Sequence, residues 1–377
     1  MITLMGVLFW VIVGVLLLIL TGFGISYALF HRLVRKRDPK YVHSFLHKHV
    51  SNPNVSLLIH YNDTPIAQKH SHTPLPLAST VKIMVAITYA KQAANGNVNP
   101  EEPISLKDLE VFHFPKTDGA AHQEWLASIR AIDKKDTVPL KEVAYGMMVY
   151  SSNANTDYLF SKLGKNAINR TIEELELKHH EPMYSIVGAL GIPSLLLTEN
   201  HTRKSALTEL QKMSIKEYRK NANTVHDRWK HNPLSHTDKN ELISHLHEGF
   251  RQLWSDRLPR STTHDYVQVM KRLNQKEHYS HEVYTHLDPL LQSLMEHPGN
   301  RKWLQHAGQK SGSTEYVLAV AFYATDQEGN RTEFAFLADK LSPYEQARLS
   351  RNMNDFQLNV LKSEEFRNEL IASLTNR

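Results

Sequence analysis

The stretch STVKIMVAITYA (residues 79–90) opens with a serine and a lysine and continues as an apolar run. Prolines at 74 and 76 disfavour helix upstream, so we expect the chain to arrive extended and to turn into a helix near Ser79. Ser79 and Lys82 are three residues apart and therefore share a helix face. A serine is a poor nucleophile until a base takes its proton, and a buried lysine with a lowered pKa can take it. The stretch therefore predicts a nucleophile and its base.

The same spacing occurs where an N-cap serine precedes a solvated lysine, so the rest of the chain decides between the two interpretations. Residues 140–150 repeat apolar side chains with a helical period and run into the polar segment SSNANTD (151–157). We expect a second apolar helix from Tyr158. The segment is either a plain junction of two helices or the polar wall of a cleft. In a cleft, its hydroxyl would relay a proton and its amide would bind a substrate carbonyl.

Strand patterns lie near both ends of the chain, and helical patterns fill the middle. Five segments predict antiparallel strands: 55–61, 66–70, 303–314, 317–323 and 332–338. Helical patterns include 165–180, two or three surface helices within 200–260, a helix opened by Thr262-Thr263 and a last helix at about 344–374. The sequence therefore predicts an α+β fold. Its five-stranded antiparallel sheet is flanked by helices and joined to a mostly helical half.

Three short motifs stand in order along the chain: Ser79-x-x-Lys82, Ser151-x-Asn153 and Lys310-Ser311-Gly312. A strand hairpin precedes the first motif, and a helix opens before the strand that carries the third. This set resembles the class A β-lactamases, within the superfamily of serine hydrolases that also includes penicillin-binding proteins. The resemblance covers about residues 50–180 and 260–377.

The resemblance implies four catalytic residues. Ser79 would attack a carbonyl and become acylated. Lys82 would act as base, directly or through Ser151, and Ser151 would pass a proton to the departing nitrogen. Lys310 would raise the positive potential of the cleft, which helps to keep Lys82 neutral.

The resemblance also implies substrate-binding groups. Asn153 would bind an amide side chain of the substrate, and Ser311 together with the Lys310 cation would hold a carboxylate. Gly312 would let the edge of the sheet approach the substrate closely. The backbone N–H groups of Ser79 and Ser313 would form the oxyanion hole.

The sequence departs from the class A pattern in two places. Those enzymes carry a Glu-x-x-x-Asn loop whose glutamate activates the deacylating water, and no clear copy stands between Ser151 and Thr262. Glu181 and Glu199 are the candidates. Without that glutamate an acyl-enzyme would persist, as in a penicillin-binding protein. The stretch 181–260 is also longer than the family needs, which predicts an enlarged helical insertion.

Composition limits the other possibilities. The chain has 377 residues with 44 basic and 39 acidic side chains, a net charge of +5 that gives little support to nucleic-acid binding. It has no cysteine, which excludes disulfides, thiolate zinc sites and cysteine nucleophiles. Its 23 histidines include no H-E-x-x-H motif, and we interpret the pairs His179-His180 and His245-Leu-His247 as surface residues. We expect no metal and no cofactor.

Residues 2–30 carry no charged side chain and exceed the length of a signal-peptide core, which predicts a transmembrane helix or signal anchor. Residues 31–50 form a basic juxtamembrane linker. Its basic side chains would place the body in the cytoplasm by the positive-inside rule, whereas the resemblance implies an extracytoplasmic enzyme. We expect a single-pass protein of the cell membrane with the catalytic domain, residues 51–377, outside the cytoplasm.

The sequence thus leads to a serine hydrolase that opens β-lactam amides through an acyl-enzyme at Ser79. Alternatives remain open. They are a penicillin-binding type of D-Ala-D-Ala peptidase or esterase, a membrane-tethered β-lactam sensor that is acylated without turnover, and a scaffold that lost its activity. The expected partners are a small-molecule or peptidoglycan-peptide substrate and the membrane.

Overall fold

The computed structural model describes residues 32, 34, 36–132, 136–198 and 202–374. The expected transmembrane segment at 2–30 and the candidate Glu199 lie outside this part of the chain. Within the described ranges, no helix has both the length and the apolar character needed to cross a membrane.

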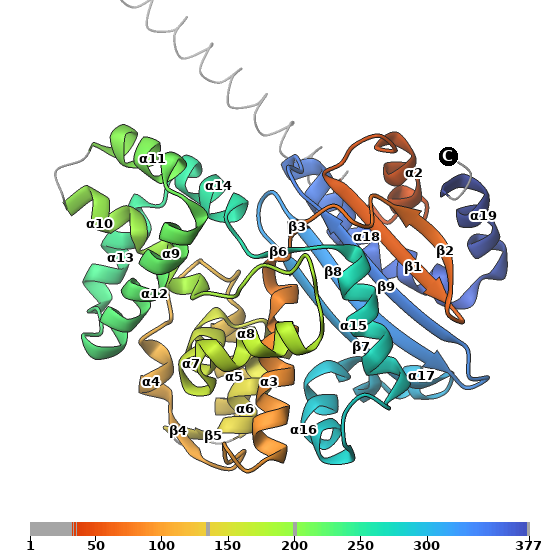
Figure 1. The fold of residues 1–377 in the computed structure, drawn as a ribbon, viewed down its shortest axis with the longest axis horizontal. Helices are drawn as coiled ribbons and strands as arrows, with labels where there is room; N and C mark the ends of the chain where they lie inside the picture. Colours follow the sequence, from red (N-terminus) through yellow and green to blue (C-terminus); the bar gives the residue numbers. More distant parts are fainter. Residues whose placement is uncertain (1–31, 33, 35, 133–135, 199–201, 375–377) are drawn as a thin grey trace, which may run out of the picture.

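A five-stranded antiparallel sheet forms the right half of Figure 1, which confirms the predicted sheet. Its order is β2-β1-β9-β8-β7, so β7 lies at one edge. All its neighbouring strands pair antiparallel. The strands are β1 (Val55–Tyr61), β2 (Thr64–Lys69), β7 (Leu304–Ser313), β8 (Leu318–Asp326) and β9 (Arg331–Ala338).

Alternate side chains of the sheet enter two separate cores, as the two-residue period of a strand requires. In β8, Val320 and Phe322 enter the core on one face, and Ala321 and Tyr323 enter the core on the other. The first core lies under three helices at the two ends of the chain, α2 (Tyr41–Lys48), α18 (Pro343–Lys362) and α19 (Glu364–Leu374). The expected single C-terminal helix is therefore two helices, separated at Ser363.

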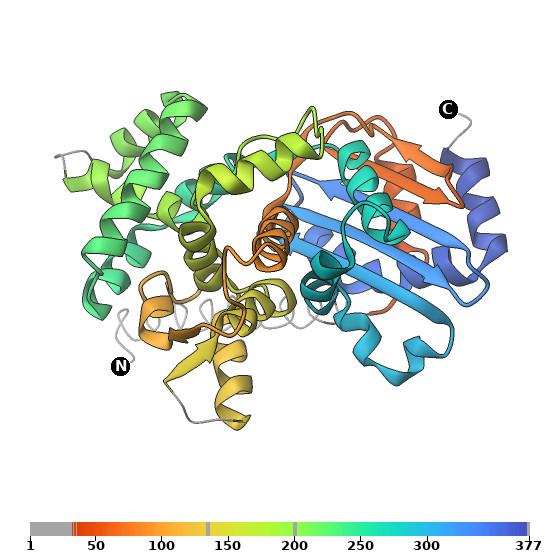
Figure 2. The same cartoon turned by 60° about the horizontal axis from the view of Figure 1, so that its bottom comes forward.

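The second core joins the other face of the sheet to the helical half (Figure 2). The helix α15 (Thr263–Gln275) packs on this face, and Thr262 caps it as predicted by accepting a hydrogen bond from the Asp265 N–H. The elements around it are α3 (Lys82–Ala94), α16 (His281–Leu291), the 3-10 turns η1 (Ala78–Val81) and η3 (Ser293–Glu296), and α17 (Pro298–Arg301).

The rest of the helical half carries the second motif. It comprises β4 (Pro103–Ser105), α4 (Leu106–Glu110), α5 (Ala121–Ile132), β5 (Thr137–Pro139), α6 (Leu140–Tyr145), the π-helical turn η2 (Gly146–Tyr150), α7 (Asn153–Leu163) and α8 (Lys165–Glu174). The second helix after the polar segment was expected from Tyr158 but begins at Asn153. The polar residues Asn155 and Asp157 are buried inside that helix, where they find hydrogen-bond partners.

The predicted insertion forms a helical group beside this half, labelled α9 to α14 in Figure 1. Its elements are α9 (Ile186–Leu190), α10 (Ile192–Thr198), α11 (Arg203–Lys212), α12 (Ile215–His231), α13 (His236–His245) and α14 (Glu248–Asp256), followed by β6 (Arg260–Ser261), which pairs with β3 (Leu75–Pro76). These are more than surface helices. They bury cores of their own around Tyr218 and Trp229, because the apolar segment 187–197 supplies a face for the charged helices to cover.

The interpretation of His180 as a surface residue is wrong. Its ring is buried, and Nδ1 donates to the Glu181 carbonyl at 2.7 Å while Nε2 lies 3.2 Å from the Tyr266 hydroxyl. Burial lowers the pKa of His180 to about 4. His179 is exposed, as expected.

A buried polar network ties α15 to the sheet. The Asn274 amide donates to Glu333 Oε1 at 2.7 Å and to the Ala324 carbonyl at 3.3 Å, and its oxygen accepts from Thr325 Oγ1 at 2.8 Å. Glu333 is fully buried, and burial raises the pKa of its carboxyl despite the hydrogen bond from Asn274.

We expect Asn274→Ala to lower the free energy of unfolding by about 2–4 kcal/mol, because it leaves a buried carboxyl without its donor. Guanidinium unfolding of the variant measures this change. Gln275→Ala, at the half-buried next position, is the matched control and should cost under about 1 kcal/mol. Equal losses in the two variants would contradict a structural role for the network.

Candidate active site

Ser79 lies in the 3-10 turn η1, immediately before α3. The residue before it, Ala78, has a φ of 43°, so the chain turns sharply just ahead of the serine. Such a backbone is unfavourable for a residue other than glycine and persists only where the surroundings hold it. Two bonds hold this turn. Thr80 Oγ1 donates to the Leu77 carbonyl at 2.5 Å, and the Leu77 N–H donates to the Pro259 carbonyl at 3.0 Å.

Gly312 brings the edge strand β7 against the nucleophile turn. A Cβ atom at position 312 would lie 2.2 Å from the backbone nitrogen of Ser79 and 2.8 Å from its Cα. Backbone groups cannot yield as a flexible side chain can, so only glycine fits there without a shift of the strand. The resemblance implied a close approach of Gly312 to a substrate, which stays a prediction. The approach that the structure shows is to the Ser79 backbone.

Lys82 is the first residue of α3, and its side chain is completely buried. Its Nζ lies 2.6 Å from the Ser151 carbonyl oxygen, 2.9 Å from Asn153 Oδ1 and 3.3 Å from Ser151 Oγ. Burial, and then the positive charge of Lys310, hold the pKa of Lys82 well below its usual range, with Asp118 and Asp157 opposing. Both causes agree with the expectation of a neutral base.

Ser151 and Asn153 stand at the junction of η2 and α7. Ser151 ends the π-helical turn in the left-handed region, with a φ of 72°. This backbone conformation presents both its carbonyl and its hydroxyl to Lys82. Ser152 then caps α7 by accepting from the Asn155 N–H at 3.2 Å. The sequence left two interpretations of the segment 151–157, a junction of two helices and the wall of a cleft, and the structure shows features of both.

The structure brings the predicted residues to one cavity of about 830 Å³. All of them except Lys82 line it: Ser79, Ser151, Asn153, Lys310, Ser311, Gly312 and Ser313. Lys82 lies beneath the surface and reaches the cavity through its contacts with Ser151. Lys310 is also buried, and this burial lowers its pKa to about 7.

The insertion closes one side of the cavity with apolar side chains. Ile186, Ala189, Leu190 and Pro193 line it from α9 and α10. The candidate Glu181 does not line it, because its carboxylate accepts from the Arg260 N–H at 3.0 Å and pairs with Arg219. Among the described residues, the carboxylates that line the cavity are those of Asp118 and Glu315.

Asp118 is a residue of the site that the sequence analysis did not identify. Its carboxylate accepts from the backbone N–H groups of His122 and Asn153, at 3.3 Å each, and so fixes the wall next to the second motif. The neighbouring Thr117 carbonyl accepts from the Asn153 amide at 3.4 Å. The nearest signal in the sequence is the turn at Gly119, which has a φ of 64°.

Asp157 anchors the insertion to the site and was also missed. It is buried in α7, one turn after Asn153. Its carboxylate accepts from the Ser185 hydroxyl and from the Val187 N–H at 3.1 Å, and lies 3.1 Å from His226 Nδ1. Ser185 precedes α9 and His226 belongs to α12, so one carboxylate connects α7 to two parts of the insertion.

Comparisons with known proteins bear on the family and the fold of the chain. A family model described as the beta-lactamase enzyme family matches residues 44–295. The match includes the first two motifs and the insertion and stops before β7, so the position of Lys310 rests on the geometry. No curated protein matches the sequence.

Solved structures of β-lactamases share the fold. One from Sphaerobacter thermophilus superposes with a TM-score of 0.51 at 14% identity, covering 84% of this chain and 95% of that one. One from Chitinophaga pinensis gives a TM-score of 0.50 at 12% identity, with 85% and 99% covered. At these identities the comparison is one of fold alone.

We expect Gly312→Ala to lower the free energy of unfolding by about 1–3 kcal/mol, because the new methyl group would overlap the Ser79 backbone. Thermal unfolding of the full chain measures this. Ser313→Ala, at the next and exposed position, is the control and should leave the melting temperature unchanged. A fully stable Gly312→Ala protein would refute the contact.

Proposed function

Because the chain belongs to the beta-lactamase enzyme family, we propose that it is a serine hydrolase that forms an acyl-enzyme at Ser79 and acts on β-lactam amides. One observation carries the proposal. Ser79, Ser151 and Lys310, which lie far apart in the sequence, line one cavity, with a buried lysine directly beneath. A surface serine with a solvated lysine does not have these surroundings.

The contacts of Lys82 support its role as the base. A neutral amine has two N–H groups and one lone pair. The N–H groups match the two nearest acceptors, the Ser151 carbonyl and Asn153 Oδ1, and the lone pair is then left for the Ser151 hydroxyl at 3.3 Å. A proton leaving Ser79 would reach Lys82 directly or through Ser151, and Ser151 would return it to the departing nitrogen.

Acylation makes one bond, breaks one bond and moves one proton. Ser79 Oγ bonds to the carbonyl carbon, the ring C–N bond breaks, and the proton from Ser79 ends on the released nitrogen. Backbone N–H groups at Ser79 and Ser313 would stabilise the oxyanion, and one such donor is typically worth about 3–4 kcal/mol. Lys310 and Ser311 would hold the substrate carboxylate, with Asn153 on the amide side chain.

We propose that deacylation is the slow step. In class A enzymes a loop glutamate activates the water, and here the corresponding stretch turns Ile186, Ala189 and Leu190 towards the cavity. The two lining carboxylates have other partners. The Asp118 carboxylate accepts hydrogen bonds from two backbone N–H groups. The Glu315 carboxylate forms an ion pair with Arg251 at 2.9 Å. A penicillin-binding type of peptidase is the second candidate, since slow deacylation is its behaviour.

We further propose that residues 2–30 anchor the chain in the cell membrane with the catalytic domain outside the cytoplasm. The charge-free sequence of that segment supports an anchor. The orientation follows from the family's substrates, which lie outside the cytoplasm. It prevails over the basic flank because large domains translocate despite local charge.

A time course with a fluorescent penicillin tests the reaction. On the full chain we expect covalent labelling that lasts for hours, with little hydrolysed drug in solution. Ser79→Ala should abolish the label, whereas Ser350→Ala, a surface serine on α18, should keep it. Rapid loss of the label with accumulation of hydrolysed drug would contradict slow deacylation. An undiminished label in Ser79→Ala would refute the acyl-enzyme.

The pH dependence tests Lys310. Because burial lowers its pKa to about 7, the free enzyme loses this cation as the pH rises through neutrality, and with it the charge that attracts an anionic substrate. Burial, and then the charge of Lys310, hold the pKa of Lys82 well below its usual range, which favours the neutral base. We expect the second-order acylation rate constant to fall about tenfold or more between pH 6 and pH 9.

Lys310→Arg supplies the matched control. Its guanidinium keeps its charge throughout, so the alkaline fall should flatten even if the overall rate is lower. A rate constant that rises with pH in the native protein, or an unchanged fall in the arginine variant, would assign the titration to another group.

A further inference from the structure

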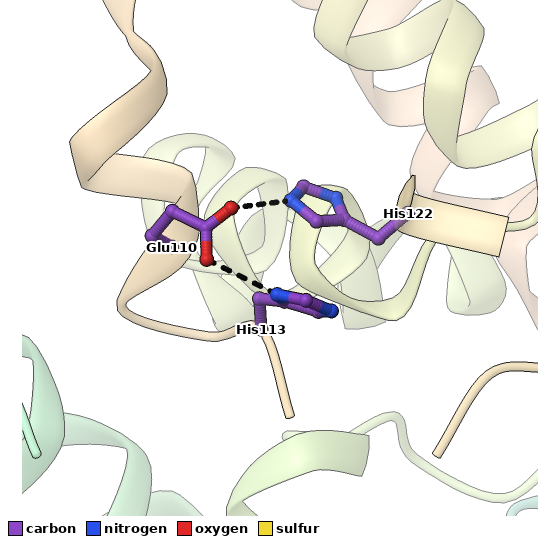
Figure 3. Close-up of side chains that lie close together, drawn as sticks. All are labelled: Glu110, His113 and His122. Atoms are coloured by element: carbon purple, nitrogen blue, oxygen red, sulfur yellow. Dashed lines mark hydrogen bonds and ion pairs between the residues drawn. The ribbon is translucent and has the colours of Figure 1, made fainter. Parts of the chain in front are cut away.

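Three side chains point toward one another next to Ser152, which His122 contacts (Figure 3). They are Glu110 at the end of α4, His113 in the following loop and His122 on α5. His113 Nδ1 lies 3.1 Å from one Glu110 carboxylate oxygen, and His122 Nε2 lies 3.4 Å from the other. The three groups offer ligand atoms that all lie within 4.8 Å of one another.

The hydrogen bonds of His122 fix which of its ring nitrogens carries the proton. Asn155 donates through Nδ2 to the Val143 carbonyl at 3.1 Å, which identifies its Oδ1 as the acceptor of the Ser152 hydroxyl at 3.0 Å. The Ser152 hydroxyl therefore donates its one hydrogen to Asn155. The contact of 2.9 Å between His122 Nδ1 and Ser152 Oγ must then be donated by the histidine.

His122 Nε2 is left with its lone pair, facing a carboxylate. The side chain is completely buried, and this nitrogen has no hydrogen-bond partner among the described residues. The lone pair of this buried nitrogen and the Glu110 carboxylate oxygen 3.4 Å away repel each other unless a positive charge lies between them. That charge is either a second proton on the ring or a cation bound by both groups.

We propose that Glu110, His113 and His122 bind a divalent transition metal ion, with Zn²⁺ as the best match. Two imidazoles and one carboxylate are ligands that Zn²⁺ takes in tetrahedral sites, where a water fills the fourth position. The bond from His122 Nδ1–H to Ser152 is the kind of outer contact that orients a metal-binding histidine. The Glu110 side chain is 47% exposed, which gives the ion a path from solvent.

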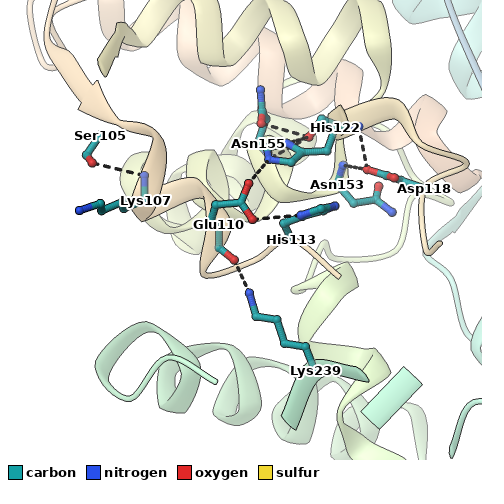
Figure 4. A network of polar contacts seen from close by, with 10 residues as sticks. Ser105, Lys107, Glu110, His113, Asp118, His122, Asn153, Asn155 and Lys239 are labelled. Atoms are coloured by element: carbon teal, nitrogen blue, oxygen red, sulfur yellow. Dashed lines mark hydrogen bonds and ion pairs between the residues drawn. The ribbon is translucent and has the colours of Figure 1, made fainter. Parts of the chain in front are cut away.

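The charges around the site are mixed (Figure 4). Lys239, on α13, donates to the backbone carbonyl of Glu110. Asp118 adds a negative charge through its bond from the His122 N–H.

Such an ion would stabilise the wall of the cavity from behind. His122 contacts Ser152 through its side chain and shares the Asp118 carboxylate with Asn153 through its backbone. A metal that fixes His122 therefore fixes the segment between Ser151 and Asn153. This role is structural. It goes beyond the proposed hydrolase reaction and does not depend on it.

The test uses the untagged full chain in detergent after treatment with a chelator. Titration with Zn²⁺ against a chromophoric chelator near neutral pH should show one tight equivalent, and Zn²⁺ should raise the melting temperature by several degrees. Glu110→Gln and His113→Gln, both at partly exposed positions, should each weaken this binding at least about tenfold and abolish the thermal shift.

A second histidine cluster provides the control. His72 and His264 pack their rings 4.6 Å apart elsewhere on the molecule, and the double variant His72→Ala/His264→Ala should keep the tight equivalent. The proposal is overturned if the native chain takes up no Zn²⁺, which would leave a protonated His122 paired with Glu110. It is equally overturned if the binding is lost in the control and retained in Glu110→Gln.

Discussion

The buried amine of Lys82 is the constraint on which the candidate site depends. A lysine removed from water needs acceptors for its N–H groups, and Lys82 finds them. Its burial also lowers its pKa and so favours the neutral amine. Its contacts with Ser151 and Asn153 join α3 to the start of α7, and the nearby Lys310 adds a reason for it to be neutral. The position of the second motif is thus set by the need of one nitrogen for partners.

The packing of the two halves supplies the rest of the geometry. One face of the sheet shares a core with α3 and α15, so the nucleophile turn is held by the same apolar contacts that stabilise the fold. The missing side chain at Gly312 lets the edge strand reach the Ser79 backbone. The cavity therefore lies where two rigid elements meet, and its residues need no long flexible loop to come together.

The sequence predicted the elements that are determined by short motifs, helix caps and the pattern of apolar residues. The spacing of Ser79 and Lys82, the apolar run at 317–323 and the cap at Thr262 each identified their elements. Errors arose where a buried polar residue forms its hydrogen bonds with residues far away in the sequence. Asp157 looked like part of a loop because its partners, Ser185 and His226, lie in another region of the chain. Asp118 and the group around His122 belong to the same class, since they depend on contacts that no short pattern encodes.

The hydrogen bonds of Asp157 also connect the insertion to α7. Because the Ser185 hydroxyl, the Val187 N–H and the His226 ring all meet this one carboxylate, a change in α9 or α12 is felt on the helix that begins with Asn153. The insertion is therefore bound to the helix that begins with Asn153 and is not a free appendage. A substitution that disturbs this junction is expected to act on the second motif as well, so its effect need not add to that of a substitution there.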